Sequence, residues 1–382
     1  MTIYFIQLLL ILFFGIAYNP NKNERRKKRY IVICWGLLII VAALRKYTIG
    51  IDLQAHFANS YLRIASLSWS ELPEYAVVRQ YGVGYVYLCK VLTLISPDIQ
   101  FFIAATSFIV YGTFAYFVYK HSDDVVFSTV FFVCYCLYYM FMNIIRQSIA
   151  LALVLIAVEL LNNSRMKSYI RYALFVGVVV VASSIHTSAI LCLILLVFTK
   201  ISYGKKEIVL AVVGSCVAFV LYDKIYGWIT ALLEDEKYTI YINSVTEGKG
   251  SFNTQSLGMF IIIFLIYILA YYTLVWRNKK RIINGNIQSL TQQNSFLMYS
   301  CLIALICRLL LFRMNIINRL SYYFIPFFLL LAPRAIGSIR NIMNRKIIRL
   351  FFYMVILAYF VIMSLDYAAT FYGVIPYEFY WN

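Results

Sequence analysis

Long apolar runs recur along the whole chain and constrain its fold more than any other feature. Several approach the roughly 20 residues that a helix needs to cross a 30 Å hydrocarbon core. The runs lie at Ile3–Tyr18, Tyr30–Leu44, Ile99–Tyr119, Val125–Met142, Gln147–Leu161, Ile208–Tyr222, Leu257–Trp276, Phe296–Phe312, Leu320–Leu331 and Leu350–Leu365. Because backbone groups inside lipid must be satisfied within one segment, these runs predict helices rather than the short alternating segments of a β-barrel.

The composition supports a membrane protein. Hydrophobic residues make up 63% of the chain and charged residues 13%, whereas soluble domains have about 45–50% and 25%. We therefore expect an all-α fold, in which residues 1–382 form a single integral membrane domain, a polytopic bundle of about twelve transmembrane helices. The first run lacks the positive region and cleavage site of a signal peptide, so we expect it to be retained as a helix.

Basic residues concentrate in short connectors between the apolar runs. The first of these connectors carries Lys22, Arg25, Arg26, Lys27, Lys28 and Arg29, and others lie at 162–171, 200–207, 277–294 and 334–349. Positively charged loops stay on the cytoplasmic side, so the N-terminus is predicted to face outward. The net charge of +18 then follows from topology, and we expect no nucleic-acid partner.

Two long segments fall on the outer side in this topology, residues 45–98 and 223–256, together with the tail after Asp366. Within the first, Tyr81–Ile95 is apolar enough to cross, but counting it as a span would place the basic connector at 162–171 outside. We interpret it as a re-entrant or tilted helix, with Ile170–Ser184 and His186–Thr199 as two short spans. The alternative makes Tyr81–Ile95 a span and joins residues 170–199 in one long helix.

Ionisable residues at membrane depth are costly and therefore indicate function. Arg45 ends the second run, and Gly50 after it permits a turn that brings Asp52 close. Arg146 lies between two apolar runs with no acidic residue near it in sequence. An anionic ligand would satisfy this guanidinium, and the structural alternative is an ion pair with Glu159 or Asp52.

Further polar groups lie farther along the chain. His186, flanked by serines and a threonine, is suited to proton transfer near neutral pH or to packing between helices. Near the end of a later hairpin lie Arg308, Arg313, Arg319 and Tyr322. These arginines either line an anion-binding cavity together with Arg45 and Arg146, or snorkel at the interface beside tyrosines.

The first outer segment contains residues suited to sugars. Glu71, Glu74, Arg79 and the sequence Tyr81-Gly82-Val83-Gly84-Tyr85 offer carboxylates and aromatic rings, although a solvated loop would look the same. The chain has no P-loop and no metal-ligand spacing, so we expect neither ATP nor a metal or other cofactor. Its eight cysteines form no C-x-x-C motif and are predicted to be small core or lipid-facing residues.

In order and spacing, these motifs resemble the EpsG family, a branch of the Wzy-type polysaccharide polymerases. The matching residues form the motifs R-x-x-x-x-G-x-D (Arg45, Gly50, Asp52), R-Q-x-I-A (Arg146, Gln147, Ala150), S-x-x-H-x-S-A (Ser183, His186, Ser188, Ala189) and R-x-x-Y (Arg319, Tyr322). The resemblance covers nearly the whole chain and implies a GT-C-like helical bundle. One position departs from the family, because Arg79-Gln80 stands before Tyr81-Gly82 where family members often carry an acidic residue.

The resemblance implies a metal-independent glycosyltransferase in the bacterial cytoplasmic (inner) membrane, with its active site facing outward. Its substrates would be oligosaccharide repeat units on undecaprenyl pyrophosphate, and a partner protein that regulates chain length is expected. A pyrophosphate leaving group gains negative charge as the glycosidic bond breaks, and preorganised arginines stabilise such charge.

We therefore expect the following roles for individual residues. The pyrophosphate would be bound by Arg146, Arg319, Arg45, Arg308 and Tyr322. Arg146 would also act in catalysis, with His186 or Asp52 as the base or acceptor-positioning group, and Glu74 and Tyr85 would contact the acceptor sugar. The competing hypotheses are a flippase or other transporter of lipid-linked oligosaccharide, a ligase of the same architecture, and a membrane acyltransferase.

Overall fold

The structure is a computed structural model that describes residues 1–221, 224, 253–277, 292–312, 315–366 and 373–382. Nearly all of the second predicted outer segment, 223–256, lies outside the described residues, and so does Arg313. Within the described residues the chain is helical, and its β structure is limited to an isolated antiparallel bridge between Arg45 and Phe379. The predicted all-α fold is confirmed.

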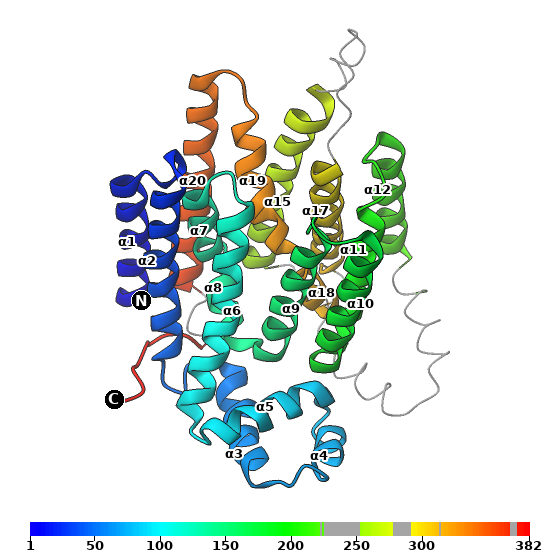
Figure 1. The fold of residues 1–382 in the computed structure, drawn as a ribbon. Coiled ribbons are helices and arrows are strands. Elements are labelled where there is room, and N and C mark those ends of the chain that lie inside the picture. Colours follow the sequence, from blue (N-terminus) through cyan, green and yellow to red (C-terminus); the bar gives the residue numbers. More distant parts are fainter. Residues whose placement is uncertain (222–223, 225–252, 278–291, 313–314, 367–372) are drawn as a thin grey trace. The chain divides into compact units, whose positions relative to one another are not determined.

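The chain divides into two compact units, each described by itself (Figure 1). Unit 1 comprises Met1–Leu193 and Phe352–Asn382. Its helices are α1 (Thr2–Tyr18), η1 (Pro20–Lys22), α2 (Glu24–Ala43), η2 (Leu53–Phe57), α3 (Ala58–Ser66), α4 (Leu72–Val78), α5 (Val83–Ile95), α6 (Ile99–His121), α7 (Val125–Cys134), α8 (Leu137–Asn143), α9 (Ile145–Leu161), α10 (Ser168–Ile185), η3 (Thr187–Leu193) and the later part of α20 (Ile342–Asp366).

Unit 2 comprises Ile194–Phe351. Its helices are α11 (Ile194–Phe198), α12 (Lys205–Val220), α15 (Thr254–Ala270), η4 (Tyr271–Trp276), α17 (Gln292–Leu310), α18 (Asn315–Ser321), η5 (Ile325–Phe327), α19 (Phe328–Gly337) and the start of α20. Within this unit α15 packs against α17 and α19, and α18 packs back on α17.

Among the described residues, six helices are long and apolar enough to cross a membrane, or seven if the bent pair α7 and α8 forms one span. The expected count of about twelve is therefore not supported. Three apolar runs form helices of only 10–17 residues, at Thr2–Tyr18, Val83–Ile95 and Thr187–Phe198. By length and composition the chain is still a multi-pass membrane protein.

Backbone breaks explain why apolar length overestimates the spans. Between α7 and α8 the axis bends by 53°, where Cys136 adopts a left-handed φ of 64°. At His186 the backbone becomes extended, so residues 170–199 do not form the single long helix of the alternative topology. The predicted short span at Ile170–Ser184 corresponds to α10, which is among the six.

The central packing of unit 1 surrounds α9. This helix buries most of its length against α10 and α6, and α2 packs on the other part of α6. Polar side chains begin several of these helices: Asn23 accepts a hydrogen bond from the N–H of Arg26 (2.9 Å), and Asp98 accepts one from Gln100 (2.9 Å). Such caps satisfy N–H groups that have no partner within the helix.

The short helices α3, α4 and α5 group together beyond the lower ends of α2, α6 and α9 (Figure 1). A buried lysine fixes this group, because the Nζ of Lys90 donates to the carbonyls of Ile64 (3.3 Å), Ala65 (3.0 Å) and Leu67 (2.6 Å). A cation at the C-terminus of α3 satisfies carbonyls that the helix leaves unpaired. At 13 residues, α5 is about 20 Å long, shorter than a hydrocarbon core, and its re-entrant position stays a prediction.

The C-terminal tail crosses the segment that follows α2. Backbone hydrogen bonds join the N–H of Lys46 to the carbonyl of Glu378 (3.0 Å) and the N–H of Gly50 to the carbonyl of Gly373 (3.0 Å). The Lys46 ammonium also pairs with the Glu378 carboxylate at 2.9 Å. These contacts hold residues 44–50 against the end of α2, at the place where the first predicted motif lies.

Candidate functional site

The turn between α4 and α5 positions two groups of the candidate site, a backbone carbonyl and an aromatic ring. Gln80 adopts a left-handed φ of 54°, and the N–H of Tyr81 donates to the carbonyl of Ala76 (2.9 Å). This 6→1 bond is the hallmark of a Schellman motif, which ends a helix and reverses the chain. A non-glycine residue in this conformation is uncommon and worth explaining by its surroundings. Here the turn presents the Gln80 carbonyl and the Tyr81 ring to the same neighbour, Arg146.

Arg146 lies in the first turn of α9. Its guanidinium carbon is 4.6 Å from the centroid of the Tyr81 ring and 5.7 Å from that of Phe57. One nitrogen, Nη1, donates to the Gln80 carbonyl at 3.2 Å. Distances below about 6 Å to a ring face are those of cation–π attraction, which orients a guanidinium without consuming its N–H groups.

No carboxylate among the described residues forms an ion pair with Arg146. The structural alternative of a pair with Glu159 is wrong, because Glu159 pairs instead with Lys120 and with His121 at 2.7 Å. A guanidinium has five N–H donors, and Arg146 is only partly buried. The α9 N-terminus adds partial positive charge, and its cap residue Ile144 offers no side-chain acceptor. This place therefore favours an anion.

Two glycines bring α5 against the end of α10. A Cβ at Gly82 would overlap the carbonyl oxygens of Ser184 and Ile185, and a Cβ at Gly84 would overlap the Ser184 side chain. The residue after Ile185 is His186, which is partly buried and whose Nδ1 lies 2.8 Å from the Ser188 hydroxyl. The close approach therefore sets His186 beside the same turn that holds Arg146.

The segment that follows α2 also contributes residues to the site. Gly50 has a left-handed φ of 106°, and a Cβ there would lie 3.2 Å from the Met142 carbonyl, just before α9. Asp52 follows, partly buried, and precedes the π-helix η2. The Tyr81 hydroxyl lies 3.0 Å from the Ser60 hydroxyl. The residues that follow Asp52 thus reach the site through Phe57, which contacts Arg146, and Ser60, which contacts Tyr81.

Three residues of this site were not predicted. Phe57 and Gln80 contact Arg146 through a ring face and a backbone carbonyl, and neither contact has a sequence signal. His56 could have been noticed, because it is four residues after Asp52. Its side chain is exposed on the π-helix, and π-helical turns often occur at functional sites.

Arg45 occupies a different environment. Its side chain is 2% exposed and donates to the Ala42 carbonyl, to the Ser107 hydroxyl (3.1 Å) and to the Met142 carbonyl (3.4 Å). These bonds cap the end of α2 and hold the break before α9. The cavity beside it, about 10 Å³ in volume, has room for about one water molecule. Arg45 therefore holds the end of α8, just before α9 begins.

The acidic residues of the first outer segment take separate places. The Ser68 hydroxyl and N–H each donate to Glu71 at 2.6 Å and hold the pKa of this carboxyl below its ordinary value. Glu74 is exposed on α4. Tyr85 is fully buried and packs edge-on against Tyr81 (5.6 Å between centroids), so its ring supports the Tyr81 ring from beneath.

Within unit 2, two predicted residues meet. Arg308 is 1% exposed and its guanidinium carbon lies 4.9 Å from the centroid of Tyr322. Arg319 is exposed on α18. The R-x-x-Y motif thus places its tyrosine on a buried arginine of α17 and leaves its own arginine at the surface.

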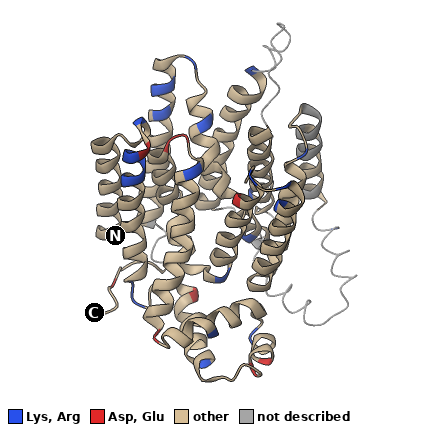
Figure 2. Ribbon diagram, in the orientation of Figure 1, with Lys and Arg blue, Asp and Glu red and all other residues tan. Residues whose placement is uncertain are grey.

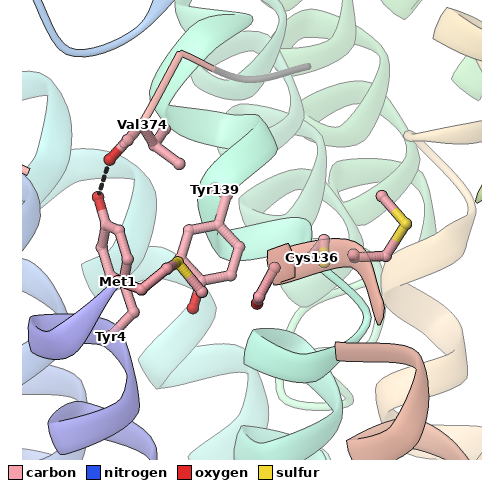
Figure 3. Close-up of a pocket in the computed structure, with 7 residues that line it drawn as sticks. Met1, Tyr4, Cys136, Tyr139 and Val374 are labelled. Carbon is pink, nitrogen blue, oxygen red and sulfur yellow. Dashed lines mark hydrogen bonds between the residues drawn. The ribbon is translucent and has the colours of Figure 1, made fainter. Parts of the chain in front are cut away.

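Another small cavity lies in unit 1 between α1, α8 and α20 (Figure 3). Its volume is about 10 Å³ and its lining is mainly apolar. The Tyr4 hydroxyl donates across one side to the Val374 carbonyl at 3.0 Å, as Figure 3 shows. This cavity is too small for a sugar, and the hydrogen bond between Tyr4 and Val374 joins the C-terminal tail to α1.

Comparison with known proteins identifies the family. No curated protein and no solved structure matches the chain. The model of the EpsG family matches residues 28–379, which include every motif of the site. The chain therefore belongs to the EpsG family of membrane proteins, which is involved in polysaccharide biosynthesis or export.

Proposed function

We propose that this protein polymerises lipid-linked oligosaccharide repeat units, the activity of the Wzy-type enzymes, into an O-antigen, capsule or exopolysaccharide. The substrate would be the repeat unit on undecaprenyl pyrophosphate, at the outer face of the bacterial cytoplasmic membrane. The observation that carries the proposal is Arg146, a partly exposed guanidinium oriented by two aromatic rings and one carbonyl at a helix N-terminus. A positive site of this kind suits a pyrophosphate.

The chemistry follows from the charge that moves in the reaction. A hydroxyl of the acceptor sugar attacks the anomeric carbon of the donor, the new C–O bond forms, and the bond from that carbon to the pyrophosphate oxygen breaks. The leaving pyrophosphate gains negative charge, which Arg146 and the α9 N-terminus stabilise. The rings of Tyr81 and Phe57 hold Arg146 in place beforehand, so little reorganisation is needed as the charge develops.

The attacking hydroxyl must lose its proton to a base. His186 and Asp52 are both partly exposed at the edges of this region, and each stays a candidate for the base or for positioning the acceptor. His56 joins them, because its exposed side chain lies on the same segment as Phe57. Histidine is the side chain best suited to proton transfer near neutral pH.

The acceptor sugar would lie against the outer segment. We assign its contacts to the exposed Glu74 carboxylate and to the aromatic pair Tyr81 and Tyr85, in which the buried Tyr85 supports the Tyr81 ring. Arg45 would act on the pyrophosphate indirectly, by fixing the end of α8 that leads into α9.

The pyrophosphate contacts predicted for Arg319, Arg308 and Tyr322 of unit 2 stay predictions. Within that unit Arg319 is exposed, and the buried Arg308 lies over the ring of Tyr322. The lipid bilayer and a regulator of chain length are the partners that this function would require.

The test is the length of the surface polysaccharide made by the native host. Arg146→Ala should reduce the ladder to single repeat units while the protein stays at normal abundance. Arg63→Ala is the matched control, because Arg63 is an exposed arginine on α3, outside the turn that holds Arg146. An unchanged ladder with Arg146→Ala would contradict the proposed site. Absence of any repeat unit at the outer face would instead indicate a flippase.

A further inference from the structure

The start of α2 carries a basic groove that the proposed reaction does not use. Figure 2 shows the Lys and Arg residues gathered on this segment, beside the turn from α1. The groove has a volume of about 320 Å³ and is lined by Arg25, Lys28, Arg29, Val32 and Ile33. No carboxylate is part of this lining.

The residues that line the groove share one face of α2, which differs from the face that packs inside the unit. Residues 25, 28, 29, 32 and 33 follow the i, i+3, i+4, i+7 pattern of one helix face. Lys27 points elsewhere: its ammonium lies 5.4 Å from the Tyr119 ring centroid and 3.8 Å from the Glu24 carboxylate. Tyr30 and Ile31 are buried within the unit. The three groove cations are exposed, and Glu24, which is not part of the lining, pairs with Lys27 instead.

The groove joins two kinds of surface. At its upper part Arg25, Lys28 and Arg29 are exposed cations. At its lower part lies the apolar face of α2, where the Val32 side chain is 63% exposed. A phosphate would be attracted by the cations, and an acyl chain would cover the aliphatic side chains. A free inorganic phosphate would use only the first of these surfaces.

We propose that this groove binds the headgroup of an anionic phospholipid, with the phosphate between Arg25, Lys28 and Arg29 and the acyl chain on Val32 and Ile33. Charge complementarity selects an anionic lipid over a zwitterionic one, because a choline headgroup adds a cation beside the phosphate. The site is independent of the polymerase reaction and would anchor the α1–α2 end of unit 1 in the leaflet that contacts it.

The probe is palmitoyl-oleoyl phosphatidylglycerol, with phosphatidylcholine of the same chains as reference, measured by native mass spectrometry on the full-length protein in detergent. Phosphatidylglycerol should bind about tenfold more tightly than phosphatidylcholine. Lys28→Gln with Arg29→Gln should remove most of this preference. The matched control is Lys22→Gln with Arg26→Gln, which removes the same charge from exposed positions outside the groove and should change the affinity by less than about twofold.

Two further experiments distinguish lipid binding from general charge attraction and from a bare phosphate site. Val32→Asn should weaken phosphatidylglycerol binding but leave thermal unfolding unchanged, because Val32 is exposed. Excess inorganic phosphate should fail to displace the lipid. Equal losses for the two double variants would overturn the proposal in favour of general charge attraction. Displacement by phosphate, or binding unaffected by Val32→Asn, would overturn it in favour of a bare phosphate site.

Discussion

Two arginines of unit 1 lie at the same helix boundary but in opposite environments. Arg45 is 2% exposed and donates to two carbonyls and a hydroxyl around the break before α9. Arg146, in the first turn after this break, is partly exposed and lies over the rings of Tyr81 and Phe57. Arg45 directs its Nη1 and Nη2 groups at protein oxygens, whereas Arg146 has one hydrogen bond within the described part of the chain, to the Gln80 carbonyl.

The difference indicates that the two arginines have different roles, one in stability and the other in activity. A buried cation is stable only when surrounding oxygens compensate it, and removing it leaves those oxygens without a donor. A cation held by ring faces is oriented while its N–H donors stay available for a ligand. We therefore expect changes at Arg45 to appear mainly in stability and changes at Arg146 mainly in activity.

The largest effect is expected for Arg146→Ala. The loss of a preorganised group that stabilises the leaving pyrophosphate should lower the polymerisation rate by about 10²–10³-fold. Thermal unfolding should change little, because the side chain is partly exposed and has no ion pair within the described residues. The rate is measured with purified protein and lipid-linked repeat unit. A loss of stability equal to that of an Arg45 variant would remove the distinction between the two arginines.

Arg45→Ala should have the opposite signature. Carbonyls of Ala42 and Met142 would lose their donor, and we expect a loss of about 2–4 kcal/mol in unfolding free energy. The readout is the thermal midpoint and the abundance of folded protein in the membrane. Arg45→Lys, which keeps a cation but not the fork of donors, should recover part of the stability. Normal stability with abolished activity would make Arg45 a substrate contact instead.

Gly82→Ala tests the contact that sets His186 beside the Arg146 turn. Its Cβ would overlap two backbone carbonyls at the end of α10, so α5 must shift. We expect about a tenfold or greater loss of activity, because misplacement by about 1 Å can cost far more than the contact itself. Gly177→Ala on α10 is the control, since nothing lies within 4 Å of its Cβ position. Similar activity in the two variants would show that the approach of α5 to α10 is unimportant.

The smallest effect is expected at Tyr81. Tyr81→Phe keeps the ring beneath Arg146 and loses only the hydroxyl contacts to Ser60 at 3.0 Å and to the His56 carbonyl at 3.5 Å, so activity should fall by no more than about threefold. Tyr81→Ala removes the ring and should cost about 1 kcal/mol more in the activation free energy. Activity is compared at saturating substrate. If Phe is as damaging as Ala, the hydroxyl rather than the ring face is what Arg146 or the substrate needs.

The sequence predicted much of the fold because apolar length alone identifies membrane helices. The runs at 99–119, 170–184, 257–276, 296–312 and 350–365 correspond to α6, α10, α15, α17 and α20. The sequence-based prediction overestimated the number of transmembrane spans, because hydropathy does not reveal where the backbone of an apolar run is broken. The left-handed Cys136 and the extended backbone at His186 result from tertiary packing, which no local pattern reveals.

The candidate site was predictable in its members but not in their arrangement. The motifs identified Arg146, Asp52, His186 and the Tyr81–Gly82 turn as polar features of an apolar chain. Arg45 and Arg146 have the same side chain, and only packing of the end of α2 makes one of them buried. The carbonyl of Gln80 and the ring of Phe57, which orient Arg146, carry no signal because any residue has a carbonyl and phenylalanine is common in this chain.

The most direct test of the central claim is the binding of a fluorescent undecaprenyl-pyrophosphate-linked sugar to the protein in nanodiscs, with Arg146→Ala compared with Arg63→Ala. If Arg146 binds the pyrophosphate, its removal weakens binding by about tenfold or more, whereas Arg63→Ala, at an exposed position on α3, changes it by less than about twofold. Binding by Arg146→Ala that equals that of the unaltered protein would contradict the account and leave Arg146 as a structural residue of α9.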